Sequence, residues 1–137
     1  MATLRLEIVT PEARVFSADV ENVTLPGVDG QLGIYPMHVP LMTQISCGEL
    51  VIRQNGATRH LAVGDGFVEI TGERVAVLTE MAIDTDHINE AEVEKARKEA
   101  EERLKKQLND EEIAVTEAAL AHAITQLEVK RRRSEGV

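Results

Sequence analysis

Three glycines at every third position are the first residues whose types and spacing could do chemistry. Gly27, Gly30 and Gly33 recur within LPGVDGQLGIYPMHVPL, residues 25–41. A glycine-rich loop binds phosphate when it opens a helix or carries a Gly-Lys-Ser/Thr motif. Here prolines follow Gly33, and neither a lysine nor a serine stands at the motif position. The spacing therefore favours turns and a surface loop over a phosphate site.

Histidine and cysteine are the other candidates for chemistry. The chain has four histidines in separate stretches, His38, His60, His87 and His122. They include no pair at metal-ligand spacing, and no serine or cysteine lies in a recognised nucleophile motif. The single cysteine, Cys47, is predicted to be a small buried hydrophobe. We find no catalytic constellation and no cofactor or metal site, and we predict a structural or contact role for His38.

The composition restricts the class of protein. The 137 residues are 43% hydrophobic but only 2% aromatic, which predicts one small core of aliphatic side chains. A net charge of −9 argues against nucleic acid as a partner, because a phosphate binder needs a basic face. No apolar stretch approaches the roughly 20 residues that span a bilayer, and the N-terminus lacks a signal-peptide pattern. We expect a soluble chain without direct membrane insertion.

The two halves of the chain differ in composition. Eight of the nine glycines and all four prolines lie at or before Gly72. Residues 1–86 carry 12 acids and 5 bases, whereas residues 87–137 carry 12 acids and 10 bases. This shift places a boundary near residues 85–88. It predicts two domains, 1–86 and 87–137.

Short alternating runs in the first half predict strands. The runs are 4–9, 14–17, 19–25, 49–54, 58–63, 66–71 and 74–79. Asn55-Gly56 is a strong hairpin signal, because a type I′ turn needs positive φ at both central residues. These runs predict a β-sandwich or flattened barrel. The stretch 25–41 is apolar but too rich in glycine and proline for a helix or one unbroken strand, and we interpret it as a shaped contact surface.

The second half predicts an antiparallel two-helix hairpin. Asn89 can cap the first helix, with Glu92 three residues on, and the second begins at about Glu111. The expected apolar stripes are small: Val93, Ala96, Ala100, Leu104 and Leu108, then Ile113, Leu120, Ile124 and Leu127. Four i,i+4 pairs are expected on the first helix: Glu94–Lys98, Glu99–Arg103, Glu101–Lys105 and Glu102–Lys106. Because such stripes bury little area, we expect a weakly docked hairpin. Four cations, residues 130–133, end it.

The sequence resembles the epsilon subunit of bacterial F-type ATP synthases, called delta in mitochondria. Three segments carry the resemblance: Leu25-Pro26-Gly27, Gly30-Gln31-Leu32-Gly33-Ile34-Tyr35-Pro36 and His38-Val39-Pro40-Leu41. The later stretch Gly64-x-Gly66-Phe67-Val68-Glu69-Ile70 is similar to a strand motif of the family. The resemblance covers nearly the whole chain.

The resemblance implies a non-catalytic rotor subunit of the central stalk, peripheral to the cytoplasmic face of the bacterial cell membrane. The sandwich would bind the gamma subunit and the c ring and couple ion translocation to ATP synthesis. The implied contact residues are Gly27, Gly30, Gln31, Tyr35, His38 and Pro40. Gln31 stands where the family often has an acid, so we expect a weaker electrostatic interaction with the c ring there.

In the family the hairpin can extend into the alpha/beta ring and block ATP hydrolysis. The resemblance thus implies an inhibitory tail that reaches acidic residues of a beta subunit: Lys130, Arg131, Arg132 and Arg133. Some members also bind ATP through Ile/Leu-Asp-x-x-Arg-Ala at the start of the first helix. Asn89, Glu92 and Val93 depart from this motif, and a carboxylate would repel a phosphate. We predict weak or no ATP binding.

Two other classes of function remain open. A small β-barrel enzyme would use His38 or His60 as base or ligand, and would hold a metal tightly. A generic β-domain with a coiled-coil adaptor would self-associate through the hairpin. The rotor interpretation instead predicts a largely monomeric free subunit.

Overall fold

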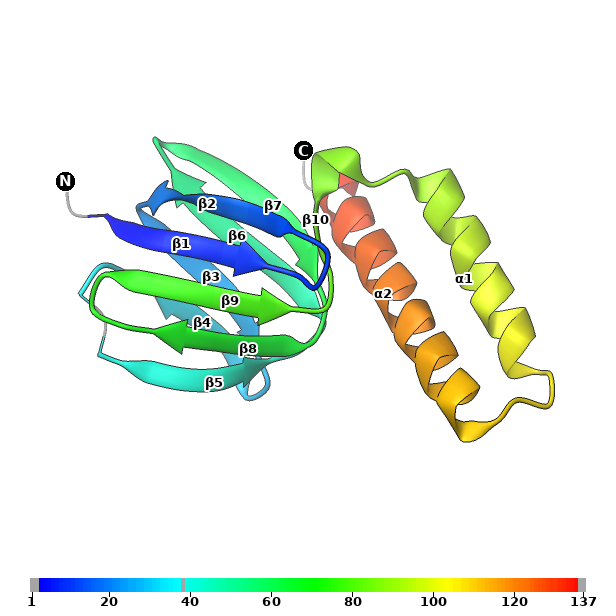
Figure 1. The fold of residues 1–137 in the computed structure, drawn as a ribbon. Coiled ribbons are helices and arrows are strands. Elements are labelled where there is room, and N and C mark those ends of the chain that lie inside the picture. Colours follow the sequence, from blue (N-terminus) through cyan, green and yellow to red (C-terminus); the bar gives the residue numbers. More distant parts are fainter. Residues whose placement is uncertain (1–2, 38, 136–137) are drawn as a thin grey trace.

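A computed structural model describes residues 3–37 and 39–135, and only the backbone of residues 133–135. The described chain forms a strand-rich part followed by two helices (Figure 1). The strands are β1 (Leu4–Val9), β2 (Arg14–Val20), β3 (Asn22–Gly27), β4 (Gly30–Ile34), β5 (Leu41–Ile45), β6 (Gly48–Gln54), β7 (Ala57–Val63), β8 (Gly66–Ile70), β9 (Arg74–Thr79) and β10 (Ala82–Asp84). The 3-10 turn η1 (Thr85–His87) leads to α1 (Glu90–Leu104) and α2 (Asp110–Glu135).

The strands form one continuous sheet that folds into two layers. The order is β10-β7-β6-β3-β5-β8-β9-β1-β2, and β4 pairs with the other edge of β3. Neighbouring strands are antiparallel except β1 and β9, which are parallel. Figure 1 shows β5, β8, β9 and β1 in one layer, in front of β3, β6 and β7. The expected sandwich is confirmed.

The core between the two layers is aliphatic, as the composition predicts. Side chains at alternate strand positions point into it and are almost fully buried. The largest include Leu6, Ile8, Leu25, Ile34, Ile45, Leu50, Ile52, Leu61 and Ile70. All of these residues precede Thr85, so the sandwich has its own core.

Two strand predictions were wrong. The run 19–25 was taken as one strand, but the chain bends at Glu21, whose N–H donates to the Arg53 carbonyl at 2.8 Å. The stretch 25–41 also contains regular structure, since the end of β3 and all of β4 form a hairpin. Pro26 is tolerated because β6 pairs with β3 only up to Thr24, so no ladder bond needs the missing N–H.

Local signals elsewhere were predicted correctly. Asn55 and Gly56 have φ of 52° and 78°, as the β6–β7 turn requires. Asn89 caps α1, and its side-chain oxygen accepts the Glu92 N–H at 3.2 Å. A reciprocal capping box opens α2: Asn109 accepts the Glu112 N–H at 2.8 Å, and Glu112 accepts the Asn109 N–H at 3.3 Å.

The predicted helix stripes need correction. Ala96 on α1 is exposed, and Ile124 on α2 is 37% exposed. The buried or half-buried residues of α2 that recur at alternating spacings of three and four are Ile113, Thr116, Leu120, Ala123 and Leu127. This spacing places them on one face, turned to α1. The prediction failed because the stripe includes a threonine and an alanine that hydrophobicity alone does not select.

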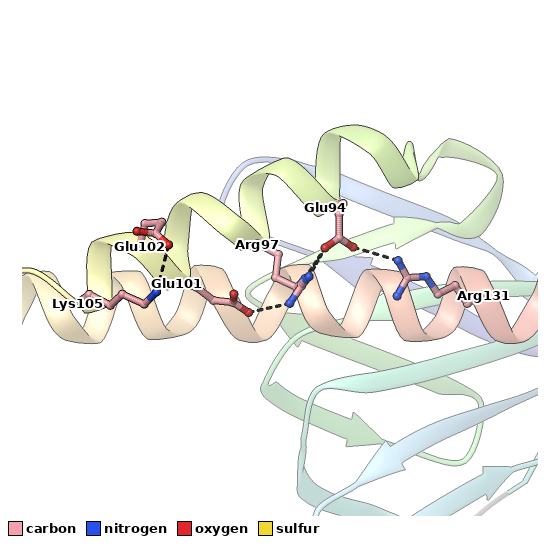
Figure 2. A network of polar contacts seen from close by, with 6 residues as sticks. All are labelled: Glu94, Arg97, Glu101, Glu102, Lys105 and Arg131. Carbon is pink, nitrogen blue, oxygen red and sulfur yellow. Dashed lines mark hydrogen bonds and ion pairs between the residues drawn. The ribbon is translucent and has the colours of Figure 1, made fainter.

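The predicted i,i+4 pairs on α1 do not form ion pairs in the part of the chain that the structure describes. Arg97 instead pairs with Glu94 and, at 2.7 Å, with Glu101, while Lys105 pairs with Glu102 at 3.2 Å (Figure 2). Arginine reaches both neighbouring turns because its guanidinium carries five donors in a planar fork. The charged surface of α1 was predicted, but its partners were not.

Candidate interaction surfaces

The structure separates the predicted contact residues into two groups at opposite ends of β4. Gly27, Gly30 and Gln31 lie at the β3–β4 turn, and Tyr35 and Pro40 lie beyond the other end of the strand. Gln31 and Tyr35 are four residues apart, or about 13 Å along a strand. His38 lies outside the described residues. The predicted single contact surface is therefore two separate surfaces.

The β3–β4 turn depends on its glycines. A Cβ on Gly27 would come within 2.6 Å of the Gly30 carbonyl oxygen, and Gly30 has φ of +125°. Val28 and Asp29 form the exposed tip, and Gln31 next to it is exposed. Because a strand and not a helix follows the glycines, the turn does not form a phosphate loop of the strand-to-helix type.

The second group belongs to an apolar loop, residues 35–41. Tyr35, Met37 and Val39 are 62%, 84% and 75% exposed. Met37 has φ of 67°, and its N–H donates to the Gly72 carbonyl at 2.8 Å. A positive φ is uncommon for a residue with a side chain. The loop thus holds apolar side chains in solvent, as a partner-binding loop would.

Sequence reasoning missed a third surface, on the outer face of the β5-β8-β9-β1 layer. Cross-strand pairing places Gln44, Phe67, Leu78 and Val9 side by side in one row. Phe67 is 52% exposed and Leu78 is 56% exposed, and together with Val28 they line a groove of about 710 Å³. The available signal was the alternation within the strands, which puts these two large apolar residues on the solvent side.

The rest of this outer face is charged. Arg74 pairs with Glu7 at 2.6 Å, and Arg5 lies 3.6 Å from Asp19 and donates to Ser17 at 2.8 Å. Internal ion pairs already use these charges. The unsatisfied part of the face is therefore the apolar groove around Phe67 and Leu78.

The predicted inhibitory tail is not a free tail in this structure. Lys130 Nζ donates to the Thr85 carbonyl at 2.8 Å. Arg131 pairs with Glu94 at 3.0 Å, and Arg132 lies 3.8 Å from Glu49. Nothing is described for the Arg133 side chain. At least three of the four cations therefore contact other parts of the same chain.

The remaining candidates for chemistry have structural partners. His60 lies 3.7 Å from Glu49, and His122 lies 3.3 Å from Glu80. Cys47 is half-buried, and burial, with the nearby Asp65 carboxylate, raises the pKa of its thiol. No group of three or more metal-ligating side chains occurs among the described residues. None of the helices in the described part is long and apolar enough to span a membrane.

The positions of the ATP-binding motif are also in structural use. The Asn89 side chain caps α1, Glu92 is exposed, and Val93 packs against a small cluster of Ala62, Ile88 and Val129. These contacts join the start of α1 to the end of α2 and to β7.

A β-sandwich that carries a two-helix hairpin, with apolar surfaces left in solvent, defines a class of small interaction subunits. Residues 3–85 match the family model "ATP synthase, Delta/Epsilon chain, beta-sandwich domain", and residues 86–131 match "ATP synthase, Delta/Epsilon chain, long alpha-helix domain". The chain belongs to the delta/epsilon-chain family of ATP synthases. The resemblance inferred from the motif of residues 25–41 is confirmed.

Relatives and solved structures agree with this assignment. The ATP synthase epsilon chain of Laribacter hongkongensis is 40% identical over 129 residues, covering 93% of this chain and 92% of that protein. That of Bacillus licheniformis is 37% identical over 131 residues, covering 96% and 100%. A chain in the Euglena gracilis mitochondrial ATP synthase (OSCP/F1/c-ring) shares the fold, with a TM-score of 0.73, 20% identity, and coverage of 93% of this chain and 81% of that one.

Proposed function

We propose that the chain is a non-catalytic, epsilon-type subunit of the central stalk of an F-type ATP synthase. The observation that carries this proposal is the near full-length similarity to proteins named ATP synthase epsilon chain. The sandwich, residues 1–86, binds the gamma subunit and the c ring, and the hairpin, residues 87–137, inhibits ATP hydrolysis on the alpha/beta ring. The subunit is peripheral to the cytoplasmic face of the bacterial membrane.

The exposed surfaces support two contacts. The turn at Gly27, Gly30 and Gln31 suits the polar loops of the c ring, because it presents backbone and an uncharged amide. The apolar groove at Phe67 and Leu78 suits gamma, since a stable protein interface has an apolar centre. The loop with Tyr35 and Pro40 supplies a further apolar contact beside either partner.

The test is ATP hydrolysis by an epsilon-free alpha/beta/gamma complex, with either the whole chain or residues 1–86 added back. The proposal expects both to bind and only the whole chain to inhibit. Because the sandwich has its own core, the shorter chain serves as a folded control. Binding by neither chain would refute the subunit assignment, and binding without inhibition would refute the role of the hairpin.

The absence of ATP binding is a separate part of the proposal. Asn89 and Val93 are engaged in the cap and in packing, and Glu92 places a carboxylate where the family motif has an arginine. Calorimetry should show no heat of ATP binding to the wild type. A chain with Asn89→Asp, Glu92→Arg and Val93→Ala restores the motif and is the matched comparison. Micromolar ATP binding by the wild type would contradict the proposal.

A further inference from the structure

Three consecutive cations near the end of α2 contact three different parts of the molecule. Lys130 binds the carbonyl of Thr85, in the turn that joins sandwich and hairpin. Arg131 pairs with Glu94 on α1. Arg132 lies against Glu49 on β6. Successive residues of a helix point about 100° apart, so one short segment reaches all three.

The acceptors of these cations are partly shielded from water. The Glu94 side chain is 25% exposed and that of Glu49 only 9%. Figure 2 shows Glu94 between Arg131 on α2 and Arg97 on its own helix. Only the pair with Arg131 joins two helices, because the Arg97 pair is local. When α2 leaves, the carboxylates of Glu94 and Glu49 each lose a cation.

The rest of the contact between α2 and the sandwich is small and mostly polar. Gln126 donates to the Met81 sulfur at 3.0 Å, and Thr125 contacts Cys47 by a side-chain hydrogen bond. Val129, which is 1% exposed, is the main apolar residue of α2 in this contact. With so little apolar area, ion pairs contribute a large share of what holds α2 in place.

We propose that Lys130, Arg131 and Arg132 form an ionic latch that holds the hairpin against the sandwich, with Glu94 and Glu49 as its acidic acceptors. The inference rests on the proposed function, in which the same cations bind acidic residues of the alpha/beta ring. A cation engaged in the latch is not available to that ring. The docked hairpin therefore withholds its own inhibitory charges, and the two acceptor acids set how readily they are released.

The test uses the full chain and its only cysteine. Thr125 contacts Cys47 in the docked state, so the rate of thiol alkylation reports undocking. Glu94→Gln removes the acceptor of Arg131 while leaving every cation in place. Glu102→Gln is the matched control, because Glu102 pairs only with Lys105 on its own helix. We expect Glu94→Gln to label about two- to fivefold faster than the wild type, as the loss of one partly exposed ion pair implies.

A second variant and a salt titration keep the test decisive. Glu49→Gln removes the other acceptor and should also speed labelling. Salt near 1 M, where the Debye length is about 3 Å, should raise the wild-type rate and leave Glu94→Gln with Glu49→Gln nearly unchanged. Labelling of both single variants at the wild-type rate would overturn the latch.

The hydrolysis assay separates the latch from the proposed function. If both hold, Glu94→Gln inhibits the alpha/beta/gamma complex at a lower concentration than the wild type, because its cations are free more often. If the wild type inhibits and neither acid variant labels faster, the latch is wrong and the proposed function stands. If the variants label faster and the wild type does not inhibit, the proposed inhibitory role is wrong and the latch stands.

Discussion

The imidazole of His122, on α2, lies directly against the bare backbone of Gly64, which follows β7. A Cβ on Gly64 would come within 2.9 Å of His122 Nε2 and 3.4 Å of the Met81 backbone nitrogen. The same imidazole lies 3.3 Å from the Glu80 carboxylate. The absence of a side chain at position 64 therefore sets how closely the hairpin approaches the sandwich.

Gly64→Ala should loosen this docking. The added methyl group requires His122 or α2 to move, so the rate of Cys47 alkylation should rise several-fold while the melting temperature of the sandwich changes little. Gly72→Ala is the matched control, since a Cβ there meets nothing within 4 Å. Equal labelling rates for the two variants would contradict the close approach.

The corrected helix face predicts unequal effects of two neighbouring substitutions. Leu127 is 2% exposed and Ile124 is 37% exposed. Leu127→Ala should lower the free energy of unfolding by about 2–4 kcal/mol, as for other buried leucines. Ile124→Ala should cost less than about 1 kcal/mol. Urea unfolding followed by circular dichroism measures both, and a larger cost for Ile124→Ala would restore the original stripe.

The apolar groove should matter for partner binding and not for folding. Replacing Phe67 and Leu78 by serine should leave the melting temperature of the free chain almost unchanged, because both side chains are more than half exposed. Affinity for the gamma subunit should fall about tenfold or more, the loss expected for central interface residues. Val115→Ser, at a residue 69% exposed on α2, is the control. Unchanged affinity in a pull-down titration would exclude the groove from the interface.

Two carboxyl groups make stability depend on acid pH. The Arg97 guanidinium, and less strongly Arg131, lowers the pKa of Glu94 against the opposing effect of burial. Burial would raise the pKa of Asp84, but hydrogen bonds from the Asp86 N–H and from Arg59 outweigh it and lower the pKa. A pKa lower in the folded state means that the unfolded chain binds the proton more tightly.

The sign of the pH effect follows directly. The stabilisation is fully present above the unfolded carboxyl pKa of about 4, and is lost as pH falls through the lower folded values. The melting temperature of the wild type should therefore fall more steeply below about pH 4 than that of Asp84→Asn or Glu94→Gln. Parallel melting curves for the three chains would show that these groups are not responsible.

Much of the fold could be predicted from the sequence because its signals are local. The Asn55-Gly56 turn, the Asn89 cap and the alternation of buried residues in β1 each depend on a few neighbouring residues and their allowed φ and ψ. The family motif in residues 25–41 belongs to the same kind of information. The aliphatic core and the position of the helices followed from these patterns.

The candidate surfaces were less predictable, because they combine residues distant in sequence. Phe67 and Leu78 become a groove only when β8 and β9 pair. The contact residues near Gly27 and Tyr35 are separated by the length of β4, which the glycines and prolines concealed.

The sequence by itself determined the strands, the turns, the caps and the family, since backbone preferences act over a few residues. Only the tertiary structure decided which face of α2 is buried and what the basic end contacts. Arg131 and Glu94 are 37 residues apart, and Lys130 and Thr85 are 45 apart. Such pairs form only after the hairpin closes and docks, because packing between elements brings their side chains within hydrogen-bonding distance.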